Sequence, residues 1–206
     1  MIAPLYQLPI KGVLWYQGEG NAKTRESCVQ YENLLKDLVV TWRANWGNAT
    51  MPFLVVQLPG FGKATGKINT KQNWPWMRES QKNIEDLNNC QTICVIDSGM
   101  QRDIHPPYKE NVGKRLAYAA QSMVYKQDSV PQSPEYSAHQ FDDESTLITL
   151  KNVGSGLSTS NPLIKDMNYN EGEVLGFTVM NANGEYQRAT GEVIAYNQIR
   201  VRHPGI

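Results

Sequence analysis

Three short apolar runs in the first half of the chain predict buried strands. The first is Lys-Gly-Val-Leu-Trp-Tyr-Gln at 11–17, which Gly18 interrupts. The second is Pro-Phe-Leu-Val-Val-Gln-Leu at 52–58, and the third is Thr-Ile-Cys-Val-Ile at 92–96, which ends at Asp-Ser-Gly. Apolar runs of this length, bounded by glycine and polar residues, are typical of strands covered on both faces.

Segments with a helical period alternate with these runs. Residues 29–46, 74–88 and 109–125 are predicted to be helices, and Gly47 ends the first of them. This alternation indicates an α/β layer fold with a parallel sheet. Ligands of such sheets bind outside the carboxyl ends of the strands, so we expect a site formed by the loops at 17–21 and 97–105.

The pattern changes near 126–137, where Gln, Asp, Ser and two Pro cluster and predict a linker. Beyond it, short alternating runs predict strands, with a turn at Asn-Ala-Asn-Gly. These runs are 145–151, 174–180, 191–195 and 198–202. We therefore expect a partial α/β domain at 1–128 and a β-rich, sandwich-like module at 129–206. The module is small beside the roughly 100 residues of a typical sandwich, and we expect it to be incomplete.

Charge and composition narrow the function. The chain has 206 residues, with 20 basic and 20 acidic side chains and no net charge, so bulk charge attracts neither nucleic acid nor an anionic membrane. No segment is apolar and long enough to span a bilayer, and no leader opens the chain. The three cysteines, Cys28, Cys90 and Cys94, lack the further ligands of a zinc site and leave a disulfide undecided.

His105 is the strongest candidate for chemistry among the three histidines. It follows the third predicted strand in Asp103-Ile-His105-Pro, and an aspartate two residues earlier can hold one ring nitrogen while the other takes a proton. Two prolines stiffen the backbone that follows the ring. His139, in the predicted linker, and His203, near the end of the chain, are interpreted as solvated surface residues.

The loop Gln17-Gly-Glu-Gly-Asn21 is a second candidate. Two glycines allow close approach of a ligand, and the Asn21 amide can donate to a developing oxyanion. By itself the loop is equally well explained as a turn, with Glu19 a solvated acid.

Five blocks, in order, resemble the sialate O-acetylesterases, a group of carbohydrate acetylesterases among the SGNH hydrolases. Trp-Tyr-Gln-Gly-Glu-Gly-Asn-Ala at 15–22 is similar to the family block Trp-Tyr-Gln-Gly-Glu-Ser-Asn-Ala. The other blocks are Trp-Arg with Trp-Gly at 42–47, Pro-Phe with Val-Gln-Leu at 52–58, the segment 76–81, and Asp-Ile-His-Pro with Gly-Lys-Arg-Leu-Ala at 103–117. The β-rich tail also resembles the family's C-terminal module.

The resemblance implies a flavodoxin-like α/β/α domain that removes acetyl groups from sugar hydroxyls with a serine nucleophile. The family's nucleophile block, Gly-Gln-Ser-Asn-Met, and the first strand are not in this sequence, so we expect them to come from a missing upstream segment and this fragment to be inactive. His105 matches the base. Gln17, Gly18 and Asn21 match the oxyanion loop.

Other family positions are less well determined. Asp103 lies two residues before His105 instead of the family's three, so Glu19 competes with it as the acid partner. Gly20 replaces a serine. Arg78 and Gln81 are candidates for contact with the sugar, with a role on the helix surface as the alternative.

Implied partners and rival readings follow from the same residues. The expected substrate is an acetylated carbohydrate, a sialic acid 9-O-ester or an acetylated xylan, with no metal or cofactor and an undetermined oligomeric state. The family implies a place outside the cytoplasm. A glycan-binding protein without catalysis, on the same scaffold, is the alternative.

Two rival motifs are set aside. Ser98 follows the third strand and is interpreted as structural. The segment 60–67 has the wrong glycine spacing for a phosphate loop.

Overall fold

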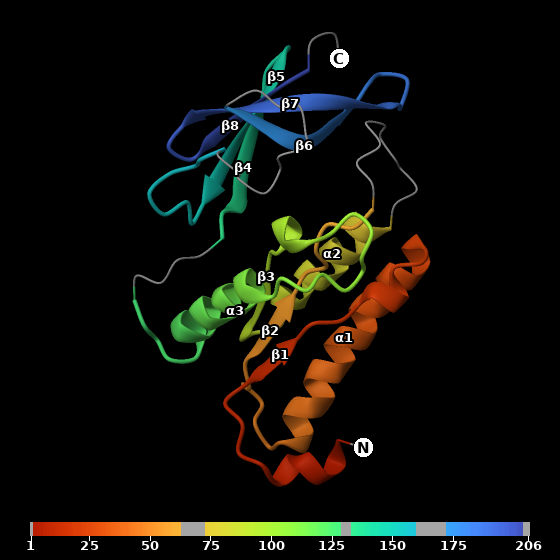
Figure 1. Cartoon of the computed structure of the whole chain (residues 1–206), viewed down its shortest axis with the longest axis vertical. Coiled ribbons are helices and arrows are strands. Elements are labelled where there is room, and N and C mark those ends of the chain that lie inside the picture. The colour runs from red at the N-terminus through yellow and green to blue at the C-terminus, as the bar shows by residue number, and fades with distance from the viewer. Residues whose placement is uncertain (1, 63–72, 129–132, 160–171, 204–206) are drawn as a thin grey trace. The chain divides into compact units, whose positions relative to one another are not determined.

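The computed structural model describes residues 2–62, 73–128, 133–159 and 172–203. Most of the loop at 59–72, including the end of the rejected phosphate-loop motif, lies outside the described residues. The chain divides between residues 130 and 131 into two compact units (Figure 1).

A three-stranded parallel sheet forms the centre of the first unit. It consists of β1 (Val13–Trp15), β2 (Phe53–Val56) and β3 (Cys90–Ile93), in the order β1-β2-β3. Val13 pairs with Phe53, and Phe53 pairs with Cys90. Among the described residues β1 has a neighbour on one side only, and its middle residue, Leu14, is 61% exposed. The predicted parallel α/β sheet is confirmed.

Three helices lie among the described residues of this unit. They are α1 (Arg25–Asn45), between β1 and β2, α2 (Trp74–Lys82), between β2 and β3, and α3 (Glu110–Met123), after β3. Thr24 begins α1 with a capping box, in which its hydroxyl accepts from the Ser27 N–H and the Ser27 hydroxyl accepts from the Thr24 N–H. The described part of the unit also contains four short 3-10 turns: η1 (Ala3–Gln7), η2 (Glu19–Asn21), η3 (Asn83–Asp86) and η4 (Ile96–Ser98).

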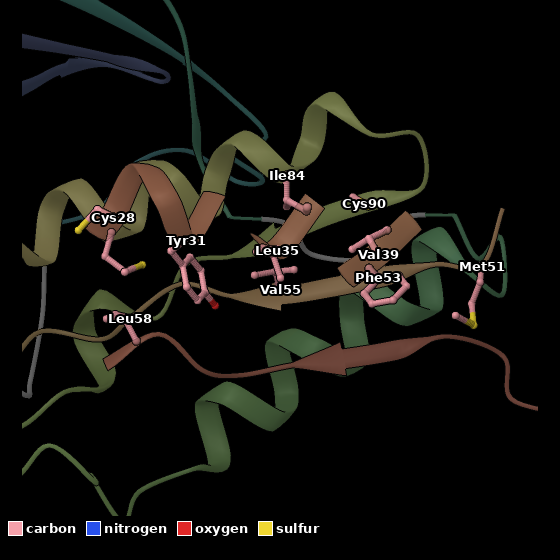
Figure 2. Close-up of a cluster of buried hydrophobic side chains, with 11 residues drawn as sticks. Cys28, Tyr31, Leu35, Val39, Met51, Phe53, Val55, Leu58, Ile84 and Cys90 are labelled. Atoms are coloured by element: carbon pink, nitrogen blue, oxygen red, sulfur yellow. The ribbon is translucent and has the colours of Figure 1, made fainter. Parts of the chain in front are cut away.

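Both faces of the sheet are covered by helices. Successive side chains of β2 point in opposite directions, so alternate residues pack on each face. Phe53 and Val55 pack with the apolar face of α1, as Figure 2 shows. Leu54 and Val56 pack against the other layer, α3. Accordingly α1 and α3 lie on opposite sides of the strands (Figure 1), which gives the three-layer arrangement.

The second unit is β-rich, as predicted. Its strands are β4 (Glu135–Phe141), β5 (Ser145–Lys151), β6 (Glu173–Met180), β7 (Tyr186–Ala195) and β8 (Gln198–Arg202). They form one antiparallel sheet in the order β4-β5-β8-β7-β6.

Two predictions for this unit are wrong. His139 lies in β4 and not in a linker, because residues 135–141 pair with β5. His203 is not a solvated end, since its Nε2 lies 3.0 Å from the Thr146 hydroxyl and its Nδ1 is buried.

Candidate active site

Two side chains hold the loop after β1 in place by donating hydrogen bonds to the same backbone carbonyl. The Gln17 carbonyl accepts from the Tyr31 hydroxyl at 2.9 Å and from the Gln81 Nε2 at 2.9 Å. Gly18 follows with a φ of 146°, and a β-carbon there would lie 3.0 Å from the Gln81 Nε2. The loop therefore requires glycine at position 18, both for its backbone angle and for the close approach of Gln81.

Gln81 is a structural residue of the site and has no exposed surface. Its Oε1 accepts from the Leu58 N–H at 2.9 Å, while its Nε2 donates to Gln17. One amide from α2 thus ties together the loops after β1 and β2. The interpretation of Gln81 as a helix-surface or sugar-contacting residue is wrong. The helical period contained the signal, because Trp74, Met77, Gln81 and Ile84 share the spacing of one buried face.

Two hydrogen-bond donors of this loop are uncommitted within the part of the chain that the structure describes. The Gly18 N–H has no acceptor there. The Asn21 Oδ1 accepts from the Gln17 Nε2 at 3.2 Å, which leaves the Asn21 amide N–H groups free to donate. A backbone N–H and a side-chain amide of this kind are the donors that an oxyanion requires. Gly20 has open space around its ideal β-carbon, so the serine of the related block would fit there.

The His105 loop lies at the same edge of the sheet. Its contact with the first loop is made by Lys109, whose Nζ lies 3.4 Å from the Tyr16 hydroxyl and 4.7 Å from the centre of the Tyr16 ring. Burial, and then the negative charge of Glu19, raise the pKa of Tyr16, which keeps this hydroxyl neutral. The contact therefore joins the residue before the first loop to the residue that precedes α3, four positions after His105.

His105 is exposed, and Pro106 behind it is buried. The Asp103 carboxylate accepts from the His105 backbone N–H at 2.8 Å, so it fixes the turn. Among the described residues neither Asp103 nor Glu19 makes a hydrogen bond to the imidazole. The choice of acid partner stays a prediction.

Arg78 projects from α2, which begins at this edge. It is half-buried, and its backbone carbonyl accepts from the Gln57 Nε2 at 2.8 Å. Burial lowers the pKa of its guanidinium, and the neighbouring Cys94 thiol opposes that shift. Within the described segments the guanidinium donates to no carboxylate or carbonyl.

Comparison with known proteins identifies the scaffold. Residues 3–122 match the family described as carbohydrate esterase, sialic acid-specific acetylesterase. The chain belongs to this family. It is 29% identical over 143 residues to the sialate O-acetylesterase of Mus musculus, in an alignment covering 61% of this chain and 25% of the mouse protein. A crystal structure of XAC1771, a carbohydrate acetylesterase from Xanthomonas citri, matches the whole chain with a TM-score of 0.83 and 35% identity. The chain covers 45% of that protein, so it spans less than half the length of either relative.

Ser98, set aside as structural, is tied to an ion pair in this family member. Its hydroxyl lies 3.5 Å from the Asp97 Oδ1, and the two Asp97 oxygens accept from the two terminal nitrogens of Arg115 at 2.6 Å each. Arg115 also donates to the Cys94 carbonyl at 2.8 Å. This pair attaches α3 to the segment that follows β3.

Metal and membrane features have no support among the described residues. No group of three or more His, Cys, Asp or Glu side chains gathers there in a way that could hold a metal ion, and the three cysteines are unpaired. No described helix has the length and hydropathy to cross a bilayer.

Proposed function

We propose that this chain supplies the base and the oxyanion loop of a serine-type carbohydrate O-acetylesterase. The contact between Lys109 and Tyr16 carries the proposal, because it holds the residue four positions after His105 against the residue just before the loop of Gly18 and Asn21. Membership of a carbohydrate esterase family supports an acetylated sugar as the substrate class. The nucleophile is assigned to a serine on a segment outside these 206 residues.

The reaction proceeds through an acyl-enzyme. The serine Oγ attacks the acetyl carbonyl as His105 removes its proton, and the carbonyl oxygen becomes an oxyanion. The Gly18 N–H and the Asn21 amide donate to that oxyanion. The intermediate then expels the sugar oxygen, which takes the proton from His105. Water, deprotonated by His105, attacks the acetyl-serine and releases acetate and free serine.

Arg78 is assigned to an anionic group of the substrate. A half-buried guanidinium without a described acceptor is suited to a carboxylate, which Arg binds through two parallel hydrogen bonds. A sialic acid ester carries such a carboxylate and an acetylated xylose does not. We therefore favour a 9-O-acetylated sialic acid over acetylxylan as the substrate.

Acetate release tests the assignment. The 206-residue chain is compared with a version extended upstream, and each is made with and without His105→Ala. Acetate released from 9-O-acetyl-N-acetylneuraminic acid only by the extended version, and lost with His105→Ala, is the expected result. His105-dependent release by the short chain would move the nucleophile to a residue of this chain, and no release by any version would favour a glycan-binding protein.

The acid partner is tested in the same assay. Asp103→Asn and Glu19→Gln each remove one carboxylate. The substitution that removes the true acid partner should lower kcat by roughly 10⁴-fold. Equal, small losses in both variants would mean that neither carboxylate orients the imidazole.

A further inference from the structure

An aromatic side chain beside the His105 loop is exposed but held in place. Phe61 lies in the loop after β2 and is 40% exposed. Its backbone forms a parallel bridge with Met100, which lies five residues before His105 in sequence and is 38% exposed. The ring is therefore fixed relative to the beginning of the His105 loop.

Backbone contacts between the loops after β2 and β3 explain why this position is rigid. The Gly60 N–H donates to the Ile96 carbonyl at 3.1 Å. A β-carbon on Gly99 would lie 1.7 Å from the Gly60 carbonyl oxygen, so the backbones of the two loops are too close for any residue other than glycine at position 99. Phe61 is the next residue after Gly60, so this contact also holds its backbone in place.

The Phe61 ring is supported on one side by Trp74. The ring centres lie 5.3 Å apart with an angle of 35° between the planes. Trp74 is itself anchored, because its Nε1 donates to the Pro59 carbonyl at 2.7 Å and its ring packs on the core beneath α1. An aromatic ring pinned in this way loses little conformational freedom on binding a ligand, which makes it an efficient contact.

We propose that Phe61, with Met100 beside it, forms a stacking subsite for the pyranose ring of the acetylated sugar. This inference rests on the proposed function for its ligand. The axial C–H groups of a pyranose form an apolar face that matches an exposed aromatic ring, while its hydroxyl groups stay at the polar rim of the site. Phe61 thereby selects esters of sugars over acetyl esters that have no ring.

The test separates ring recognition from catalysis. In the extended, active version, Phe61→Ala should raise KM for xylose tetraacetate roughly tenfold, equivalent to about 1.4 kcal/mol, with kcat nearly unchanged. KM for glyceryl triacetate, an acetyl ester without a sugar ring, should not change. Phe61→Trp should restore the KM for the sugar ester.

Trp76→Ala is the matched control. Trp76 is 37% exposed, close to the exposure of Phe61, but the Arg25 guanidinium covers its ring at 4.1 Å from the centre. The control should leave both KM values within about twofold, since the Arg25 guanidinium already occupies the ring face that a sugar would need.

A binding experiment on the 206-residue chain keeps the inference testable without catalysis. Saturation-transfer NMR with xylose should give a signal for the unaltered chain and for Trp76→Ala, and none for Phe61→Ala, with circular dichroism confirming that each variant is folded. If Phe61→Ala abolishes sugar binding but no version of the protein releases acetate, the esterase assignment is refuted and the subsite stands. An unchanged xylose signal in Phe61→Ala, or equal KM changes for both esters, would refute the subsite.

Discussion

Replacing Gln81 by leucine would leave unsatisfied hydrogen-bonding groups in two loops while keeping the volume of the core nearly constant. Gln81 has no exposed surface and bridges the Leu58 N–H and the Gln17 carbonyl. Leu58 is also fully buried, so its N–H would lose its acceptor at a cost of about 1–3 kcal/mol.

The free-energy cost of losing Gln81 differs between the two groups that it bridges. The Gln17 carbonyl keeps the Tyr31 hydroxyl at 2.9 Å, so the loss there is smaller, about 0.5–1.5 kcal/mol. The added apolar surface of leucine offsets roughly 1 kcal/mol of this. We expect a net destabilisation of about 2 kcal/mol for Gln81→Leu.

Urea unfolding followed by tryptophan fluorescence measures this loss. All five tryptophans lie between positions 15 and 76, so the emission reports on the first unit alone. With a slope near 2 kcal/mol per molar, the midpoint should fall by about 1 M.

The matched control is Gln30→Leu, the same chemical change at an exposed position of α1, which should shift the free energy of unfolding by less than about 0.5 kcal/mol. Equal midpoints for the Gln81→Leu and Gln30→Leu variants would refute the reasoning.

The Gln81→Glu variant adds a pH dependence with a defined sign. A carboxylate can accept from Leu58, but only the protonated acid can also donate to Gln17. The folded state therefore raises the pKa of the new acid above its ordinary value of about 4.3. The cost of Gln81→Glu relative to the unaltered chain should therefore be smallest below about pH 4.3 and should grow as the pH rises through the raised pKa, as urea titrations of both proteins across this range would show.

Two further predictions concern the loop glycines and the ion pair. Gly18→Ala should destabilise the first unit by about 1–3 kcal/mol in the same urea titration, because of its positive φ and the nearby Gln81, while Gly20→Ser should change stability little; equal effects would contradict the geometry. The Arg115 guanidinium lowers the pKa of Asp97, so this carboxylate contributes stability above its unfolded pKa of about 3.9 and loses it as the pH falls through the lower folded value. Asp97→Asn should therefore cost about 1–2 kcal/mol at pH 7 and almost nothing in strong acid, and a penalty independent of pH would rule out the ion pair as its source.

The parts of the fold that depend on local pattern were predictable. The strand at 53–56 and the helix beginning near 110 follow directly from apolar runs and helical spacing. The helix predicted at 74–88 ends instead at Lys82, because the next turn tightens into η3, and an apolar period does not distinguish the two kinds of helix.

β4 was missed for a physical reason. A register shift between Tyr136 and Ala138 interrupts the two-residue alternation, and most of its side chains are exposed, so the strand lacks the usual apolar signal. It exists because β5 supplies hydrogen-bond partners, which a local pattern cannot show.

The candidate site divides in the same way. Its two loops were predictable because the carboxyl ends of parallel strands share an edge. The contacts that hold them, from Gln81 and from Lys109 to Tyr16, join residues 64 and 93 positions apart, and tertiary packing alone determines them.

Among the described residues, the outer edge of β1 is open to pairing with a strand from another polypeptide. Backbone N–H and C=O groups along an edge strand accept another strand whether or not the two are covalently joined. If the proposed function holds, a separately expressed polypeptide that carries the proposed serine and a strand is expected to pair beside Val13–Trp15, with the two pieces working as a split enzyme. Acetate release that appears only on mixing, and follows the concentration of the added piece, would report how tightly that edge binds the added strand.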